Sequence, residues 1–86
     1  MDERIRGNIE LFRRLVPRNT HLYVVDKGIG ADVFAIIKEE ERTSLEDAYE
    51  LTVANTKYAP GFAVLPIEQK RLTPAVKEFL DGLEKL

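Results

Sequence analysis

The stretch that decides the fold runs from Thr20 to Glu40 and reads THLYVVDKGIGADVFAIIKEE. Two apolar runs in it, Leu22 to Val25 and Val33 to Ile37, predict strands. The link between them, Asp26 to Ala31, contains two glycines and a charged pair, which is typical of a turn. Because a link this short cannot carry a crossover to a parallel neighbour, the strands are predicted to pair as an antiparallel hairpin.

Helical segments are predicted before and after this hairpin. From Asp2 to Val16 the apolar residues recur at helical spacing, and Pro17 ends the segment. A second helix is predicted after Thr43 and Ser44, which precede Glu46 and Asp47 at capping-box spacing, with its apolar residues inward: Leu45, Ala48 and Leu51. Thr73 and Pro74 supply an N-cap and a first-turn proline for a terminal helix, whose apolar stripe is Val76, Phe79, Leu80, Leu83 and then Leu86.

A third strand is predicted from Phe62 to Leu65, after a turn at Tyr58 to Gly61 and before Pro66. Because it follows a helix, it can lie parallel to an earlier strand. The predicted order is therefore α-β-β-α-β-α. It indicates one α+β domain over residues 1–86, a two-layer arrangement with a small three-stranded mixed sheet packed by helices.

Composition narrows the class of protein. The chain has 86 residues, of which 44% are hydrophobic and 33% charged, and this indicates a small globular domain. There is no cysteine, so we expect neither disulfides nor thiolate metal sites, and a reducing cytoplasm fits best. No run is long enough for a membrane span, and the N-terminus does not resemble a secretory signal. The high content of Glu, Lys and Arg favours a thermophilic source.

The charge is distributed unevenly along the chain. The net charge of −2 makes nucleic acid an unexpected partner. Residues 1–18 nevertheless sum to +2, whereas residues 38–50 sum to −4. These segments are either two solvated faces or surfaces that pair, within the fold or between two copies, so a protein partner or a homodimer is expected. The alternative, a nucleic-acid contact, would use the arginines of the first segment: Arg4, Arg6, Arg13, Arg14 and Arg18.

The hairpin link supplies the candidate ligand-binding residues, which are Asp26, Lys27, Gly28, Gly30 and Asp32. Carboxylates, a lysine and glycines are the residue types that hold phosphate or metal ions. Gly28-Ile29-Gly30 follows a strand, as a dinucleotide-binding loop does, but a third glycine is missing and a strand is predicted next. The preferred interpretation is a glycine-rich hairpin turn. We predict no cofactor, no metal ion and no catalytic residue.

The order of elements and the ending Pro66 to Leu80 resemble the minimal nucleotidyltransferases of the DNA polymerase beta superfamily. That resemblance implies a Gly-Ser pair that holds phosphates after the first strand. It also implies two aspartates one residue apart on the second strand and a third carboxylate on a later one, which bind two metal ions. At the position of the Gly-Ser pair this chain has Asp26-Lys27, followed by Gly28. At the position of the aspartate pair it has Asp32-Val33-Phe34, so only Asp32 matches. Phe62 to Leu65 offers no carboxylate.

The favoured interpretation is a non-catalytic α/β module that acts through protein contacts. Its order of elements would be that of a degenerate nucleotidyltransferase-like domain, which has lost most of the phosphate- and metal-binding residues. The first alternative is Mg²⁺-dependent nucleotidyl or phosphoryl transfer, or nucleotide binding, through Asp32 and the link Asp26 to Ala31. The second is the arginine-based nucleic-acid contact.

Overall fold

The computed structural model describes residues 1–56 and 61–86. Three helices and four strands follow one another as α1 (Glu3–Leu15), β1 (His21–Asp26), β2 (Ala31–Ile37), α2 (Arg42–Asn55), β3 (Phe62–Glu68), α3 (Pro74–Asp81) and β4 (Glu84–Lys85). Short 3₁₀ turns, Glu39–Glu41 and Gln69–Arg71, precede α2 and α3. No helix within the described ranges has the length and apolar character needed to cross a membrane.

The four strands form one mixed sheet in the order β3-β2-β1-β4. β1 and β2 pair antiparallel, with Tyr23 opposite Phe34 and Val25 opposite Asp32, so the predicted hairpin is confirmed. β2 and β3 pair in parallel, with Phe34 opposite Leu65, as the intervening helix α2 allows. The structure thus confirms an α+β fold with a small mixed sheet.

The predicted count of three strands is wrong, because the chain ends in β4, which pairs antiparallel with β1. The apolar stripe of the terminal helix was expected to continue to Leu86. Instead Gly82 ends α3, and the Leu86 N–H donates to the Leu22 carbonyl at 3.0 Å. Gly is a poor helix former, and the free edge of β1 offers backbone partners at this point.

Strand β3 is longer than predicted, because it continues through Pro66 to Glu68. It lies at the edge of the sheet. A proline has no N–H to donate, and an edge strand tolerates it where that position faces away from the sheet. The turn predicted at Tyr58 to Gly61 lies outside the described residues except for Gly61.

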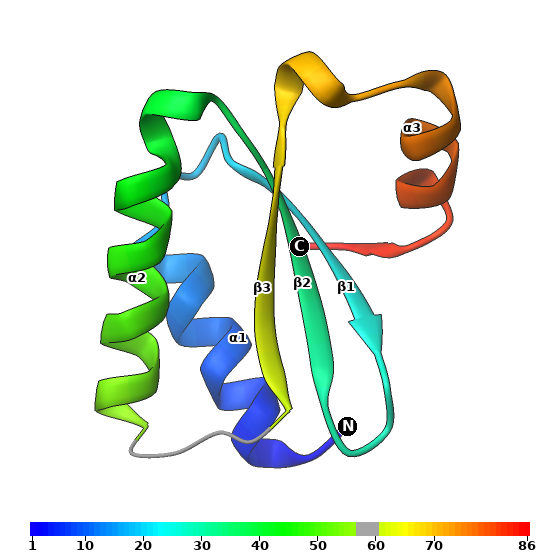
Figure 1. Ribbon diagram of the computed structural model, residues 1–86. Coiled ribbons are helices and arrows are strands. Elements are labelled where there is room, and N and C mark those ends of the chain that lie inside the picture. Colours follow the sequence, from blue (N-terminus) through cyan, green and yellow to red (C-terminus); the bar gives the residue numbers. More distant parts are fainter. Residues whose placement is uncertain (57–60) are drawn as a thin grey trace.

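Helices α1 and α2 cover one face of the sheet and build the main core (Figure 1). Asp2 caps α1, since its Oδ1 accepts from the Arg4 N–H at 2.7 Å. The capping box expected at Thr43 and Ser44 is replaced by one at the preceding 3₁₀ turn, where Glu41 Oε1 accepts from the Lys38 N–H. The core side chains are Ile5, Ile9, Phe12, Val16, Leu22, Val24, Ala31, Val33, Ala35, Ile37, Leu45, Ala48 and Phe62. Leu51 was expected inward, but it is 51% exposed and Thr52 is buried in its place.

Helix α3 lies on the opposite side of the sheet from α1 and α2, so the predicted two-layer arrangement is wrong (Figure 1). Thr73 caps this helix as expected, because its Oγ1 accepts from the Val76 N–H. Leu80 is buried, and Phe79 contacts Phe34 edge to face with the ring centroids 5.8 Å apart. With only eight residues, α3 covers one end of this second face.

Candidate functional site

The predicted ligand-binding link is a tight turn held by its own polar groups. The Asp26 Oδ1 accepts from the Gly28 N–H at 2.8 Å, and the Lys27 N–H donates to the Gly30 carbonyl at 2.8 Å. The second Asp26 oxygen lies 3.8 Å from the N-terminal ammonium of Met1. Asp26 therefore closes the turn, as Asp side chains commonly do.

Lys27 and Asp32 form an ion pair across the turn, with Nζ and Oδ2 2.7 Å apart. Asp32 lies on β2 between the core residues Ala31 and Val33, so its side chain points to the face that α3 partly covers. Lys27 covers that carboxylate, whose side chain is only 18% exposed. The two charges neutralise each other.

The two glycines of the link are explained by backbone geometry. Gly28 has a φ of +83°, which side-chain-bearing residues rarely adopt. Gly30 lies against Gly61, and a Cβ on Gly30 would sit 2.7 Å from the Gly61 carbonyl oxygen. The glycines therefore permit the turn and the contact of β2 with the start of β3.

The structure does not bring the predicted carboxylates together as metal ligands. Asp26 and Asp32 are engaged by different partners, as described above. Within residues 1–56 and 61–86, no three His, Cys, Asp or Glu side chains are grouped so that they could hold a metal ion. The described residues thus supply no ligand set for two Mg²⁺ ions, which bind through several oxygen ligands each.

Among the five arginines near the N-terminus, Arg13 stabilises the fold through hydrogen bonds of its side chain. The Arg13 guanidinium donates to the carbonyls of Thr20, Pro17 and Arg18 at 2.7, 3.0 and 2.8 Å. It holds the connection between α1 and β1 and satisfies carbonyls that follow the helix. The other four are exposed: Arg4, Arg6, Arg14 and Arg18.

A charged cluster at the end of β3 was not foreseen. Arg42 Nη2 lies 3.1 Å from Glu68 Oε1, while Lys70 Nζ is 3.4 Å from Glu68 Oε2 and 3.3 Å from Glu39 Oε2. The Arg42 hydrogen bond lowers the pKa of Glu68, together with the nearby Lys70 and Arg71 and against a smaller upward effect of burial. Because Glu68 belongs to β3 and Arg42 to α2, the cluster joins these elements.

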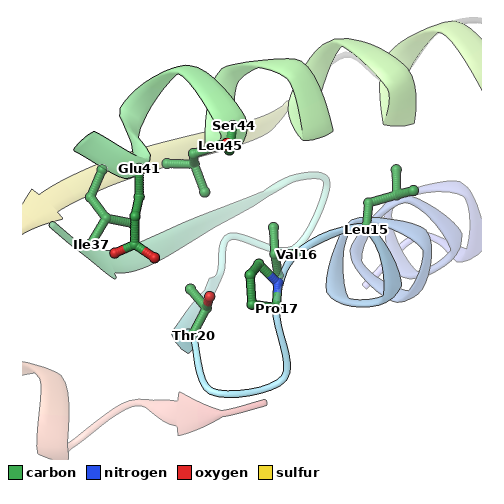
Figure 2. Close-up of a pocket in the computed structure, with 8 residues that line it drawn as sticks. All are labelled: Leu15, Val16, Pro17, Thr20, Ile37, Glu41, Ser44 and Leu45. Atoms are coloured by element: carbon green, nitrogen blue, oxygen red, sulfur yellow. The ribbon is translucent and has the colours of Figure 1, made fainter. Parts of the chain in front are cut away.

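A small cavity lies where the end of α1 meets the beginning of α2. Figure 2 shows Leu45 of α2 and Val16 of the α1–β1 connection pointing toward each other across it. Its volume is about 110 Å³. Sites for small-molecule ligands usually measure roughly 300–1,000 Å³, so this cavity is too small to be one.

A larger groove, of about 490 Å³, runs between α2 and the edge strand β3. Leu45 and Tyr49 of α2 line it on one side and Val64 and Pro66 of β3 on the other. The Tyr49 hydroxyl reaches across to donate to the Phe62 carbonyl at 3.1 Å. Glu46 and Glu50 stand on its α2 wall.

The second face of the sheet carries large apolar side chains. We call the part of the second sheet face next to α3 the open sheet face. It consists of Tyr23, Val25, Phe34, Ala63 and Leu65 of the strands, with Asp32 between Val25 and Ala63 and with Phe79 of α3 at its margin. Strand register aligns Tyr23, Phe34 and Leu65 in one row across β1, β2 and β3. Leu65 is 39% and Phe79 54% exposed. Alternation along each strand places the strand residues of this face opposite the main core, but it did not show that α3 would cover only one end of the face.

Comparison with known proteins adds no family to this description. No family model, no curated protein and no solved structure matches the chain.

Proposed function

We propose that this chain is a non-catalytic interaction module that associates with a second copy of itself through the open sheet face. The observation that carries the proposal is the row of Tyr23, Phe34 and Leu65, extended by Phe79, whose ring contacts that of Phe34 edge to face. Large apolar side chains that lie together on a surface mark interaction sites, because covering them removes apolar area from water.

The charges at this face favour a second copy as the occupant. Lys27 and Asp32 are already paired, and Lys85 Nζ lies 5.7 Å from the centre of the Tyr23 ring, a cation–π contact. Two such faces can therefore approach without strong repulsion between like charges. Sheets that pack face to face bury side chains between layers about 10 Å apart.

The size of the molecule is compatible with such a dimer. A stable interface covers about 800 Å² of each partner, which is about one seventh of the 5821 Å² surface of this chain. A domain of this length also has a small core of its own, so association adds apolar burial that the monomer lacks.

Light scattering over a range of protein concentrations tests the proposal. We expect the mass of a dimer for the natural chain and of a monomer for Leu65→Glu, which places a charge in the row. Leu51→Glu is the matched control, because Leu51 is 51% exposed on α2, away from the open sheet face. A natural chain that stays monomeric at millimolar concentration contradicts the proposal, as does a dimer that Leu65→Glu leaves intact.

A further inference from the structure

Strand β3 has a free outer edge. It is the first strand in the order β3-β2-β1-β4, so only its β2 side is paired within the described sheet. The Gly61 carbonyl accepts from the Ala31 N–H at 2.9 Å and therefore faces β2. Since backbone groups alternate in direction along a strand, those of Phe62, Val64 and Pro66 face outward. The Tyr49 hydrogen bond to the Phe62 carbonyl comes from that outer side and agrees with this assignment.

The outward groups are those that an added strand needs. Tyr49 occupies the Phe62 carbonyl, and Pro66 has no N–H. By the same alternation the Val64 N–H, the Val64 carbonyl and the Pro66 carbonyl face outward, and both residues line the groove between α2 and β3. An extended segment placed there can exchange main-chain hydrogen bonds with β3, the mode known as strand addition.

The charged side chains that line the groove favour a basic ligand. Arg42, at one end, is bound to Glu68 at 3.1 Å, whereas Glu46 and Glu50 have no ion-pair partner among the described residues. These two glutamates are four residues apart on α2, about 6.0 Å along the axis. Alternate residues of an extended strand are about 6.6 Å apart on one side. Basic side chains at alternate positions of a bound strand therefore match the two carboxylates.

We propose that the β3 edge binds an extended, basic segment of a partner protein, with Lys or Arg at alternate positions facing Glu46 and Glu50. The intervening side chains are apolar and lie beside Leu65, at the border of the open sheet face. A second copy of this chain fits the edge less well. Pairing β3 with β3 would bring the Glu46 and Glu50 of both copies together and oppose two prolines.

A titration with a synthetic peptide of alternating Val and Lys tests this inference, with an alternating Val and Glu peptide as the reversed-charge control. We expect the Val-Lys peptide to shift the Val64 amide resonance and to slow its hydrogen exchange. The Val-Glu peptide is expected to do neither. Equal binding of the two peptides, or a Val64 amide that neither peptide affects, overturns the proposal.

Two variants locate the interaction. Glu46→Lys combined with Glu50→Lys should weaken binding of the Val-Lys peptide roughly tenfold or more, because two surface ion pairs are lost and each becomes a repulsion between like charges. The matched control is Glu40→Lys combined with Asp47→Lys. It makes the same change in net charge at exposed positions that do not line the groove, and should leave binding within about twofold. Equal effects of the two double variants contradict a site in the groove.

Val64→Pro removes the outward N–H and also replaces a partly buried side chain that packs against the core. The edge strand already accepts Pro66 two residues later, so the variant should fold and lose peptide binding. Circular dichroism checks the fold, and the groove variants test the site independently if the strand is disturbed. Because Tyr23 of β1 belongs to the open sheet face but lies two strands away from the β3 edge, Tyr23→Glu should abolish dimerisation but leave peptide binding. Failure of the inference is therefore distinguishable from failure of the proposed dimer. A Val64→Pro chain that loses self-association instead identifies a second copy as the occupant of the edge and overturns the inference.

Discussion

Gly30 and Gly61 meet backbone to backbone, with the position of an added Cβ on Gly30 only 2.7 Å from the Gly61 carbonyl oxygen. The next residue, Ala31, donates its N–H to that same carbonyl at 2.9 Å. The contact sets where the parallel pairing of β2 and β3 begins, because Ala31 lies opposite Phe62.

This contact predicts that Gly30→Ala is destabilising. The methyl group forces backbone to shift, and such overpacking costs about 1–3 kcal/mol in free energy of unfolding. Gly7→Ala is the control, because no atom lies within 4 Å of its added Cβ and it is exposed on α1. That variant should gain about 0.5–1 kcal/mol. Urea denaturation measures both, and a Gly30→Ala chain as stable as the natural one would show that the backbones are not in close contact.

Arg13 predicts a difference between two neighbouring arginines. Arg13→Lys removes a planar group that donates to three carbonyls, and we expect a loss of about 1–2 kcal/mol in free energy of unfolding. Arg14→Lys, at an exposed position on the same helix, should change stability by less than about 0.5 kcal/mol. The same urea experiment compares the two. Equal effects would mean that the carbonyl contacts contribute nothing measurable.

The lowered pKa of Glu68 predicts a dependence of stability on pH. A carboxyl whose pKa is lower in the folded chain stabilises it above its ordinary value of 4.5, and that stabilisation is lost as the pH falls below this value through the lowered pKa. The natural chain should therefore lose more stability between pH 6 and pH 3 than Glu68→Gln does. Denaturation at several pH values measures the difference. Parallel curves for the two chains would contradict the ion-pair assignment.

Asp32 separates the proposed module from the enzymatic alternative. If its role is the pair with Lys27, Asp32→Ala should cost less than about 1 kcal/mol, as partly exposed ion pairs do. We expect no Mg²⁺-dependent binding of nucleotide to the natural chain at millimolar concentration, measured by calorimetry. Binding that appears with Mg²⁺ and disappears in Asp32→Ala would instead favour phosphoryl or nucleotidyl transfer.

The predictable parts of the fold were those encoded over short stretches. The hairpin followed from Leu22 to Val25, the glycine link and Val33 to Ile37. The start of α3 at Pro74 followed from this proline and from the Thr73 cap before it. The β4 strand could not be predicted, since its two residues have no strand pattern and pair only because β1 lies beside them. The Glu68 cluster was equally hidden, because Arg42 and Glu68 are 26 positions apart.

The sequence by itself determined the α+β class, the main helices and the antiparallel hairpin, because helical period, caps and turn residues act between neighbours in the chain. It also singled out Asp26, Lys27, Gly28, Gly30 and Asp32 by residue type. Only the tertiary structure decided that these residues pair with one another and with the backbone, and that Phe34 and Leu65 lie on a face that α3 covers at one end, with Phe79 against Phe34. The physical reason is that partners and burial depend on contacts between distant segments, which residue type and local spacing do not specify.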